Sequence, residues 1–442
     1  MHEICYMGAT AMTRMMQAGQ LSAREVLESH WEQIDRVNPT FNAIVTEVRE
    51  QSMAAAKQAD QRQAQRKPLG PLHGLPIAHK DLFETAGIRT TFGSPLFKDY
   101  VPLEDDPIVQ RIRQAGAITI GKTNTPEFGA GSQTFNTLFG ATRNPYDETK
   151  TCGGSSGGAA VALACGMMPI ADGSDLGGSL RNPAAFCNVV GFRPSLGLIP
   201  DPKGSPLATA GPMARTVSDA ALLLSVIAAP DQRFARDLGR DFHGVRVAWF
   251  DTLGGVPFDP RVRSVVDSRR TAFENLGCVV EQAEPDFEGA GFAFKTIRAW
   301  HSAQRHGELF LKHPGSYKDT LRQEIETGLR LSQTDLEHAE AVRSQLSRRF
   351  QTFLEKYEYF ILPTTQVPPF AIEEPYPTQI DGVPMHGYID WMKSCWYISV
   401  MGNPAISVPA GFTEGLPVGL QIVGRSNQDF SVLQLAQAFT AG

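Results

Sequence analysis

The chain has 442 residues, of which 42% are hydrophobic and 20% are charged, and its formal net charge is -6. This composition is typical of a globular protein with a sizeable core and excludes a disordered or fibrous chain. The acidic balance argues against a nucleic-acid footprint, so we expect no nucleic-acid partner.

The N-terminal sequence MHEICYMGATAMTRMM lacks a basic region followed by an apolar run, so we expect no secretory signal. The longest small apolar stretch, residues 159–171, is shorter than the roughly 20 residues that a membrane span needs. We therefore predict a cytoplasmic protein without membrane contact.

Six cysteines are scattered along the chain without a C-x-x-C pair, and in a chain of this size they indicate buried free thiols. His301 and His306 are five residues apart, unlike the spacing of the H-E-x-x-H zinc motif. We expect neither a metal nor a cofactor.

Helix and strand patterns alternate along the chain. Ser22 and Glu25 form a capping-box signature for a helix that ends near Pro39. We then expect a buried strand at 74–81, a helix at 107–116 and a strand at 117–123. Further helix and strand pairs are expected at 263–277 with 278–282 and at about 333–357 with 357–363, followed by paired strands at 404–411 and 417–424.

This alternation predicts an α/β fold, with a mixed, mostly parallel sheet covered by helices on both faces. We expect a single domain over residues 1–442. Within it we expect an N-terminal helical segment at about 1–65 and a helical, charge-rich segment at about 290–345 that acts as a cap over a site.

Two glycine-flanked serines lie close together, in TCGGSSGG at 151–158 and SDLGGSLR at 174–181. Clustered glycine indicates a backbone that bends sharply or approaches another group closely. A flexible linker is one interpretation of the first loop, but the run AAVALACG that follows is typical of a buried helix. A phosphate-binding loop would need a lysine after Gly158, which this chain lacks.

Gly153, Ser155 and Gly157 also match the G-x-S-x-G nucleophile elbow of α/β-hydrolases. That elbow follows a buried strand, whereas the preceding residues ATRNPYDETKTC are polar and turn-like. Lys80 favours a different chemistry, in which a lysine and not a histidine is the base. Lys80 ends the apolar stretch GLPIAHK, where burial would disfavour its charged form and let it act as a base, although a lone lysine near a strand end is more often solvated.

Taken together, these residues resemble the amidase signature enzymes, and most closely the stand-alone bacterial amidases of the aryl acylamidase or urethanase type. The resemblance runs through GLPIAHKD, AITIGKTNTPEFG, FGATRNPYD, TCGGSSGGAAVALACG, SDLGGSLRNPAAFCNVVGFRPS, GPMART and GNPAISVPAGFTEGLPVGLQIVG. The positions that match the family's Ser-cisSer-Lys triad are Ser179, Ser155 and Lys80. The resemblance thus implies the amidase signature fold and an amide hydrolase.

An amide carbonyl is a poor electrophile, so the nucleophile must be activated and the oxyanion held. Ser179 is expected to attack and to pass its proton through Ser155 to neutral Lys80, whose pKa must fall from about 10.4 toward roughly 7 to 8. The resemblance also implies a cis peptide between Gly154 and Ser155. Backbone N–H groups are expected to face the oxyanion at Leu176, Gly177, Gly178 and Ser179.

Asp175 and Arg181 flank the second loop, and we interpret them as an ion pair that holds it; two solvated charges are the alternative. Two departures from the commonest family pattern lie outside the triad. His79 precedes Lys80 and either tunes it or packs, and Cys152 replaces a proline.

The stretch that matches the family's acyl-pocket wall consists of small residues, namely Gly129, Ala130, Gly131 and Ser132. Nearby aromatic residues are candidates for the same pocket, namely Tyr388, Trp391, Trp396 and Tyr397, with Trp391 and Trp396 as the chosen pair. Aromatic side chains are most often core, but if several line the site, an aryl or bulky apolar amide, carbamate or ester is favoured over a charged amino-acid amide.

Two other functional classes remain. A glutamine-hydrolysing amidotransferase subunit would use the same triad with partner subunits and would need charged anchors for glutamine, which the small-residue wall lacks. A non-catalytic binding protein is disfavoured by the intact Lys80, Ser155 and Ser179. We expect a small-molecule amide substrate and a monomer or homodimer.

Overall fold

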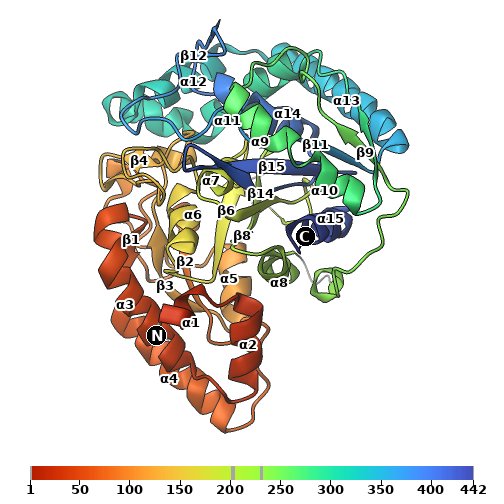
Figure 1. The fold of residues 1–442 in the computed structure, drawn as a ribbon. Helices are drawn as coiled ribbons and strands as arrows, with labels where there is room; N and C mark the ends of the chain where they lie inside the picture. The colour runs from red at the N-terminus through yellow and green to blue at the C-terminus, as the bar shows by residue number, and fades with distance from the viewer. Residues whose placement is uncertain (1, 201–204, 229–231, 442) are drawn as a thin grey trace.

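The computed structural model describes residues 2–200, 205–228 and 232–441 (Figure 1). The helices are α1 (His2–Tyr6), α2 (Ala9–Gln17), α3 (Ala23–Phe41), α4 (Arg49–Ala64), α5 (Pro107–Gln114), α6 (Gly157–Ala164), α7 (Arg181–Phe186), α8 (Val217–Ile227), α9 (Pro260–Asp267), α10 (Arg270–Asn275), α11 (Ala290–Lys312), α12 (Asp319–Arg330), α13 (Gln333–Lys356), α14 (Lys393–Met401) and α15 (Asp429–Ala441). Single 3-10 turns lie at Pro95–Phe97, Glu127–Gly129, Gln232–Ala235, Pro314–Ser316 and Asp390–Met392.

The strands are β1 (Ile44–Glu47), β2 (Pro76–Lys80), β3 (Ile118–Thr123), β4 (Phe135–Asn136), β5 (Gly140–Ala141), β6 (Ile170–Asp175), β7 (Val190–Arg193), β8 (Thr209–Ala214), β9 (Arg246–Trp249), β10 (Val279–Gln282), β11 (Tyr359–Pro363), β12 (Gln379–Ile380), β13 (Val383–Pro384), β14 (Ala405–Thr413) and β15 (Leu416–Gly424). Within the described residues they form one eight-stranded sheet, in the order β10-β9-β11-β15-β14-β7-β8-β6, one three-stranded sheet, β1-β3-β2, and two short hairpins.

The large sheet is mixed, which confirms the predicted α/β fold, but the expectation that it is mostly parallel is wrong. Only β10 with β9 and β9 with β11 pair in parallel, and every other neighbouring pair is antiparallel. The reason is visible at β14 and β15, which are joined by the two residues Glu414 and Gly415, both with positive φ. So short a connection permits a hairpin but not a parallel crossover.

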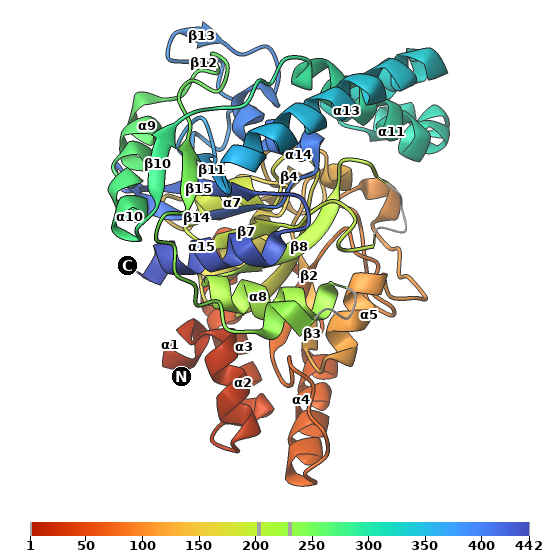
Figure 2. The same cartoon turned by 90° about the vertical axis from the view of Figure 1, so that its right-hand side faces the viewer.

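Helices cover both faces of the large sheet: α8 and α15 lie on one side and α9 and α14 on the other (Figures 1 and 2). The three-stranded sheet packs beside it with α3 and α4. The strand β1 lies between α3 and α4 and pairs with β3, so the segment 1–65 is not purely helical. Helices α11, α12 and α13 occupy the region proposed as a cap and lie together at one end of the molecule.

Local sequence signals explain several boundaries. The Ser22 hydroxyl accepts from the Glu25 N–H and the Glu25 carboxylate accepts from the Ser22 N–H, so the predicted capping box is confirmed. The helix predicted at 263–277 is two helices, because it breaks after Asp267. There the Ser268 hydroxyl donates to the Val265 carbonyl at 2.7 Å and competes with the helical backbone.

All six cysteines are buried and unpaired in disulfides, as predicted. In the part of the chain that the structure describes, no helix is long and apolar enough to cross a membrane. A cytoplasmic location remains a prediction.

Candidate active site

Lys80 is the last residue of β2 and has no solvent-exposed surface. Its Nζ donates to three hydroxyl oxygens, those of Ser155 at 2.7 Å, Ser156 at 2.9 Å and Ser174 at 3.1 Å. Ser156 and Ser174 were missed by the sequence analysis, although both lie in the two glycine loops. The three hydroxyl groups surround the amine at the end of this buried side chain.

Burial lowers the pKa of Lys80 to about 7, and the carboxylates of Asp175 and Asp172 oppose that shift only in part. This value agrees with the range that the sequence argument required. A neutral amine has two N–H bonds and one lone pair, so it can donate to two of the three hydroxyls and accept from the third. The site therefore holds a lysine that can act as a base near neutral pH.

The first glycine loop places Ser155 against Lys80. The peptide between Gly154 and Ser155 is cis, as the family resemblance implied. A Cβ on Gly157 would lie 2.3 Å from the Thr134 hydroxyl and one on Gly158 would lie 2.4 Å from the Asn124 nitrogen. Glycine is needed here because the loop touches its neighbours through backbone atoms.

The second loop follows β6 and leads into α7. Asp175, at the end of β6, accepts from Arg181 at 2.9 Å and from the Leu180 N–H at 3.2 Å, and both charged side chains are fully buried. The ion pair of Asp175 with Arg181 that the sequence predicted is confirmed. Arg193, which was not predicted, lies 3.1 Å from the same carboxylate. Burial alone would raise the pKa of Asp175, but the two guanidinium groups hold it well below its usual range.

One of the four backbone N–H groups that were expected to face the oxyanion, that of Gly178, is bonded elsewhere. The N–H of Gly178 donates to the Asp175 carboxylate at 2.8 Å, so it does not face the space beside Ser179. The N–H groups of Leu176, Gly177 and Ser179 make no hydrogen bond to any residue that the structure describes. These three donors are therefore the ones available to a developing negative charge.

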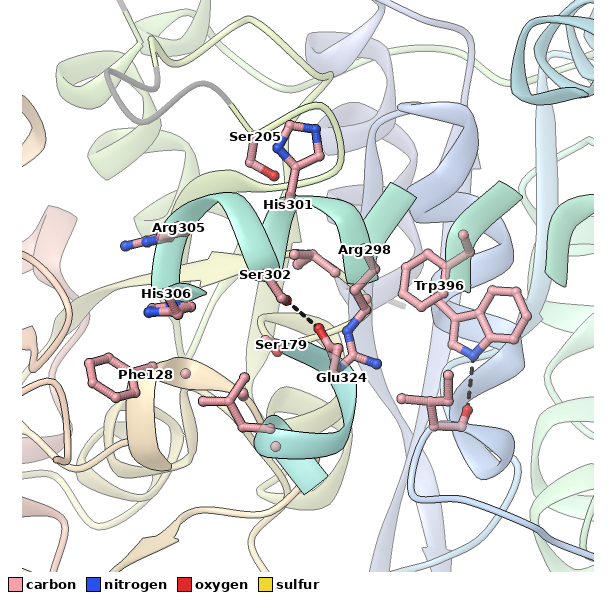
Figure 3. A pocket seen from close by; sticks show the side chains of 18 of the residues that line it. Phe128, Ser179, Ser205, Arg298, His301, Ser302, Arg305, His306, Glu324 and Trp396 are labelled. Atoms are coloured by element: carbon pink, nitrogen blue, oxygen red, sulfur yellow. Dashed lines mark hydrogen bonds and ion pairs between the residues drawn. The ribbon is translucent and has the colours of Figure 1, made fainter. Parts of the chain in front are cut away.

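Ser179 opens onto a cavity of about 500 Å³ (Figure 3). The predicted wall residues Gly129, Ala130 and Gly131 line this cavity, together with Leu176, Gly177 and the predicted Trp396. Gly129 also lies near Ser155, because a Cβ built on it would lie 3.7 Å from Ser155 Oγ. The small residues thus leave open space beside Ser179, which lines the same cavity.

Two predicted pocket residues do not line the cavity. Ser132 is buried and its hydroxyl accepts from the indole N–H of Trp391 at 3.3 Å. Trp391 is fully buried and stacks on Phe186, with ring centroids 5.6 Å apart. Both expectations were wrong because these residues form core contacts behind the wall, and Tyr397 likewise stacks on Phe287.

The largest group of residues missed by the sequence analysis comes from the cap helices. Arg298 and His301 of α11 and Glu324 of α12 line the cavity, together with Phe128, Phe294 and His306. Tyr388, which the sequence had offered as a pocket candidate, lines it as well. Arg298 forms an ion pair with Glu324 and also donates to the Tyr388 hydroxyl, while Ser302 donates to Glu324 (Figure 3). The charge of the segment 290–345 was the only sequence signal for the residues of α11 and α12.

The chain is similar to known proteins over almost its whole length. The family model described as Amidase matches residues 25–433. An acylamidase from Rhodococcus erythropolis is 36% identical, with 99% of this chain and 95% of the relative aligned. A glutamyl-tRNA(Gln) amidotransferase subunit from Symbiobacterium thermophilum is 35% identical, with 98% and 96% aligned. The solved structure of a bacterial aryl acylamidase of the amidase signature enzymes superimposes with a TM-score of 0.92 at 27% identity, covering 99% of this chain and 96% of that one.

Proposed function

The chain belongs to the amidase family and is an amide-hydrolysing enzyme, and from that premise we propose that Ser179 is its nucleophile, Ser155 the proton relay and Lys80 the base. The single observation that carries this assignment is the contact of 2.7 Å between Lys80 Nζ and Ser155 Oγ. A lysine with a pKa of about 7 supplies a neutral base at physiological pH.

In the first half of the reaction, Ser179 Oγ bonds to the amide carbonyl carbon while its proton moves to Ser155 Oγ. The Ser155 proton moves in turn to Lys80 Nζ. The tetrahedral intermediate then expels the amine, which takes a proton back through the same relay, and an acyl-enzyme remains on Ser179. Water repeats the sequence and releases the acid, so atoms and protons balance over the cycle.

The carbonyl oxygen gains negative charge in both tetrahedral intermediates. The N–H groups of Leu176, Gly177 and Ser179, which have no hydrogen-bond partner among the described residues, supply donors for it, and Asp175 holds the backbone that carries them. Because this loop is anchored before substrate arrives, little reorganisation is needed during the reaction.

The proposed substrates are aryl or bulky apolar amides, and carbamates or esters of similar shape. The support is the cavity wall, where Phe294 and Trp396 stack with centroids 4.7 Å apart and Phe128 lies 4.8 Å from the His306 ring. Aromatic side chains bury large apolar groups, and the glycines of the opposite wall leave room for them.

A glutamine-hydrolysing amidotransferase subunit is the second candidate, because relatives with that name are nearly as similar as the acylamidase. Glutamine is a zwitterion and needs unbalanced charges to bind. The Arg298 guanidinium in the cavity is already balanced by Glu324, so this wall suits an uncharged group better than an amino-acid carboxylate.

The test measures chromophore release from a series of acyl nitroanilides by the purified chain alone, with Ser179→Ala as the matched control. Hydrolysis by the wild type and none by the variant is expected, and the preferred acyl group reports the cavity size. Ammonia release from glutamine without nitroanilide hydrolysis would overturn the substrate proposal in favour of the amidotransferase.

A further inference from the structure

His79 and Asp172 form a buried polar pair directly behind the proposed base. His79 is next to Lys80 on β2, and because side chains alternate along a strand it points to the face opposite the Lys80 side chain. Its Nδ1 lies 2.5 Å from Asp172 Oδ2 and its Nε2 lies 3.1 Å from the Thr119 hydroxyl. Both residues of the pair have no exposed surface.

The pair joins two separate sheets at their edges. β2 is the edge strand of the three-stranded sheet, and β6, which carries Asp172, is the edge strand of the eight-stranded sheet. The Lys80 backbone N–H donates to Asp172 Oδ1 at 2.8 Å. The carboxylate of Asp172 on β6 therefore binds two consecutive residues of β2, the backbone N–H of Lys80 and the imidazole ring of His79.

This junction sets where the base lies relative to the nucleophile. β6 continues past Asp172 to Ser174, whose hydroxyl contacts Lys80 Nζ, and then to the loop that carries Ser179. Lys80 belongs to the other sheet. A shift of one sheet against the other would change the reach of Lys80, and misplacement of reacting groups by about 1 Å can cost about 100-fold in rate.

We propose that His79 and Asp172 are positioning residues for this reaction: Asp172 fixes Lys80 against the strand that carries the nucleophile loop and places a negative charge behind it, and His79 holds that carboxylate in place. The inference rests on the proposed role of Lys80 as base. It gives a function to the histidine that departs from the commonest family pattern.

The negative charge of Asp172 affects the basicity of Lys80, in addition to the effect of Asp172 on the position of Lys80. The carboxylate of Asp172 raises the basicity of Lys80 against the effect of burial, together with Asp175. Among the other charged or titratable groups on the described elements packed around Lys80, the buried ones are Asp81, which directly follows β2, Lys122 of β3 and His30 of α3. The charged residues of α3 are exposed, and α6 has none. Asp81 accepts from Thr91, and Lys122 donates to Phe83 and Thr85, so both are bonded away from Lys80.

The first test is the pH profile of kcat/KM for Asp172→Asn. Asparagine keeps the shape and can accept from the Lys80 N–H, but it removes the charge. We expect the acidic limb to move to lower pH by about 0.5 to 1 unit, because a lysine without the nearby carboxylate loses its proton more easily. Asp81→Asn is the matched control, a buried carboxylate next to Lys80 in sequence whose loss is expected to leave the limb in place.

The second test compares two variants at His79. Asparagine can place an N–H near the position of Nδ1 and is expected to keep activity within about 3-fold, whereas His79→Leu leaves Asp172 Oδ2 unpaired and is expected to lose about 10-fold to 100-fold. Equal activity of the two variants, or an unmoved limb in Asp172→Asn, would overturn the proposal.

A third measurement separates this inference from the proposed function. The pH dependence of Ser179 modification by phenylmethanesulfonyl fluoride reports the activation of the serine without an amide substrate. It is expected to show the same limb shift in Asp172→Asn. If Lys80→Met reacts as fast as the wild type, the proposed base is wrong; if only Asp172→Asn fails to shift, the base stands and this inference is wrong.

Discussion

Nζ of Lys80 lies 2.7 Å from Oγ of Ser155, at the inner end of a side chain that no solvent reaches. This contact joins β2 of one sheet to the glycine loop in front of α6. The hydroxyl groups of Ser156 and Ser174 also contact Lys80 Nζ, so all three partners of this amine are serine hydroxyls. The chemistry that we propose depends on this relationship.

Replacement of Lys80 or Ser179 is expected to abolish hydrolysis. Lys80→Met, Ser155→Ala and Ser179→Ala should each lower kcat by about 1000-fold or more, because residues that act as a unit fail together. Steady-state kinetics on an acyl nitroanilide measures this. The double variant Lys80→Met/Ser179→Ala should be no slower than either single variant, and additive losses would contradict a shared pathway.

The rate is expected to rise with pH through about 7 and then level off. Lys80 must be neutral to accept a proton, and its pKa is lowered by burial to about 7. The profile of kcat/KM should therefore show one acidic limb near that value. A limb near the ordinary lysine value of 10.5 would show that Lys80 is not the base in its neutral form.

The burial of Lys80 is also expected to lower the free energy of unfolding of the protein. The folded pKa of about 7 lies below the ordinary value of 10.5, so the unfolded chain binds the extra proton between these two values and stability should rise with pH across that interval. Lys80→Met removes the titrating group. It should raise Tm at pH 7 and flatten the dependence of Tm on pH from 7 to 10, whereas a lowered Tm would contradict this account.

The Asp175 ion pair is expected to be required for folding stability. Asp175→Asn removes one charge and leaves Arg181 and Arg193 buried together, which should cost about 3 to 5 kcal/mol of unfolding free energy. Chemical denaturation measures the loss. Glu358→Gln, which breaks a half-buried pair with Arg240, is the comparison and should cost about 1 kcal/mol or less.

Two neighbouring glycines of the second glycine loop, Gly177 and Gly178, are expected to respond differently to replacement by alanine. Gly178 has φ +122°, and a Cβ there would lie 2.5 Å from Cys395 Cβ, so Gly178→Ala should distort the loop and lower kcat by about 100-fold or more. Gly177 has no such φ, and its Cβ would meet Phe294 at 3.1 Å. Gly177→Ala should mainly raise KM, and kinetics of both variants on one substrate decides.

The ion pair in the cavity is expected to exclude anionic substrates. Glu324→Gln leaves the Arg298 charge unbalanced, so kcat/KM for a succinyl nitroanilide should rise about 10-fold relative to the butyryl compound. Glu308→Gln, on the exposed surface of α11, is the control with the same charge change. An unchanged ratio in Glu324→Gln would show that Arg298 does not face the acyl group.

The sequence by itself determined the local elements and the proposed triad. The capping box of Ser22, the buried strand that ends at Lys80 and the two glycine loops are patterns over a few neighbouring residues, and such patterns act through backbone geometry that the chain carries with it. The family resemblance then assigned roles to Lys80, Ser155 and Ser179. The cis peptide was anticipated in the same way.

Only the tertiary structure decided the direction of the strands, the walls of the cavity and the support of the base. Asp172 meets His79, and Arg298 of α11 meets Glu324 of α12, because separate elements pack together, and no local periodicity records such pairs. Both Trp391 and Trp396 are buried, but the same packing brought only Trp396 to the cavity wall among these two, although they lie five residues apart. Local sequence sets how each segment folds, whereas partners between segments are chosen by burial and hydrogen-bond satisfaction over the whole chain.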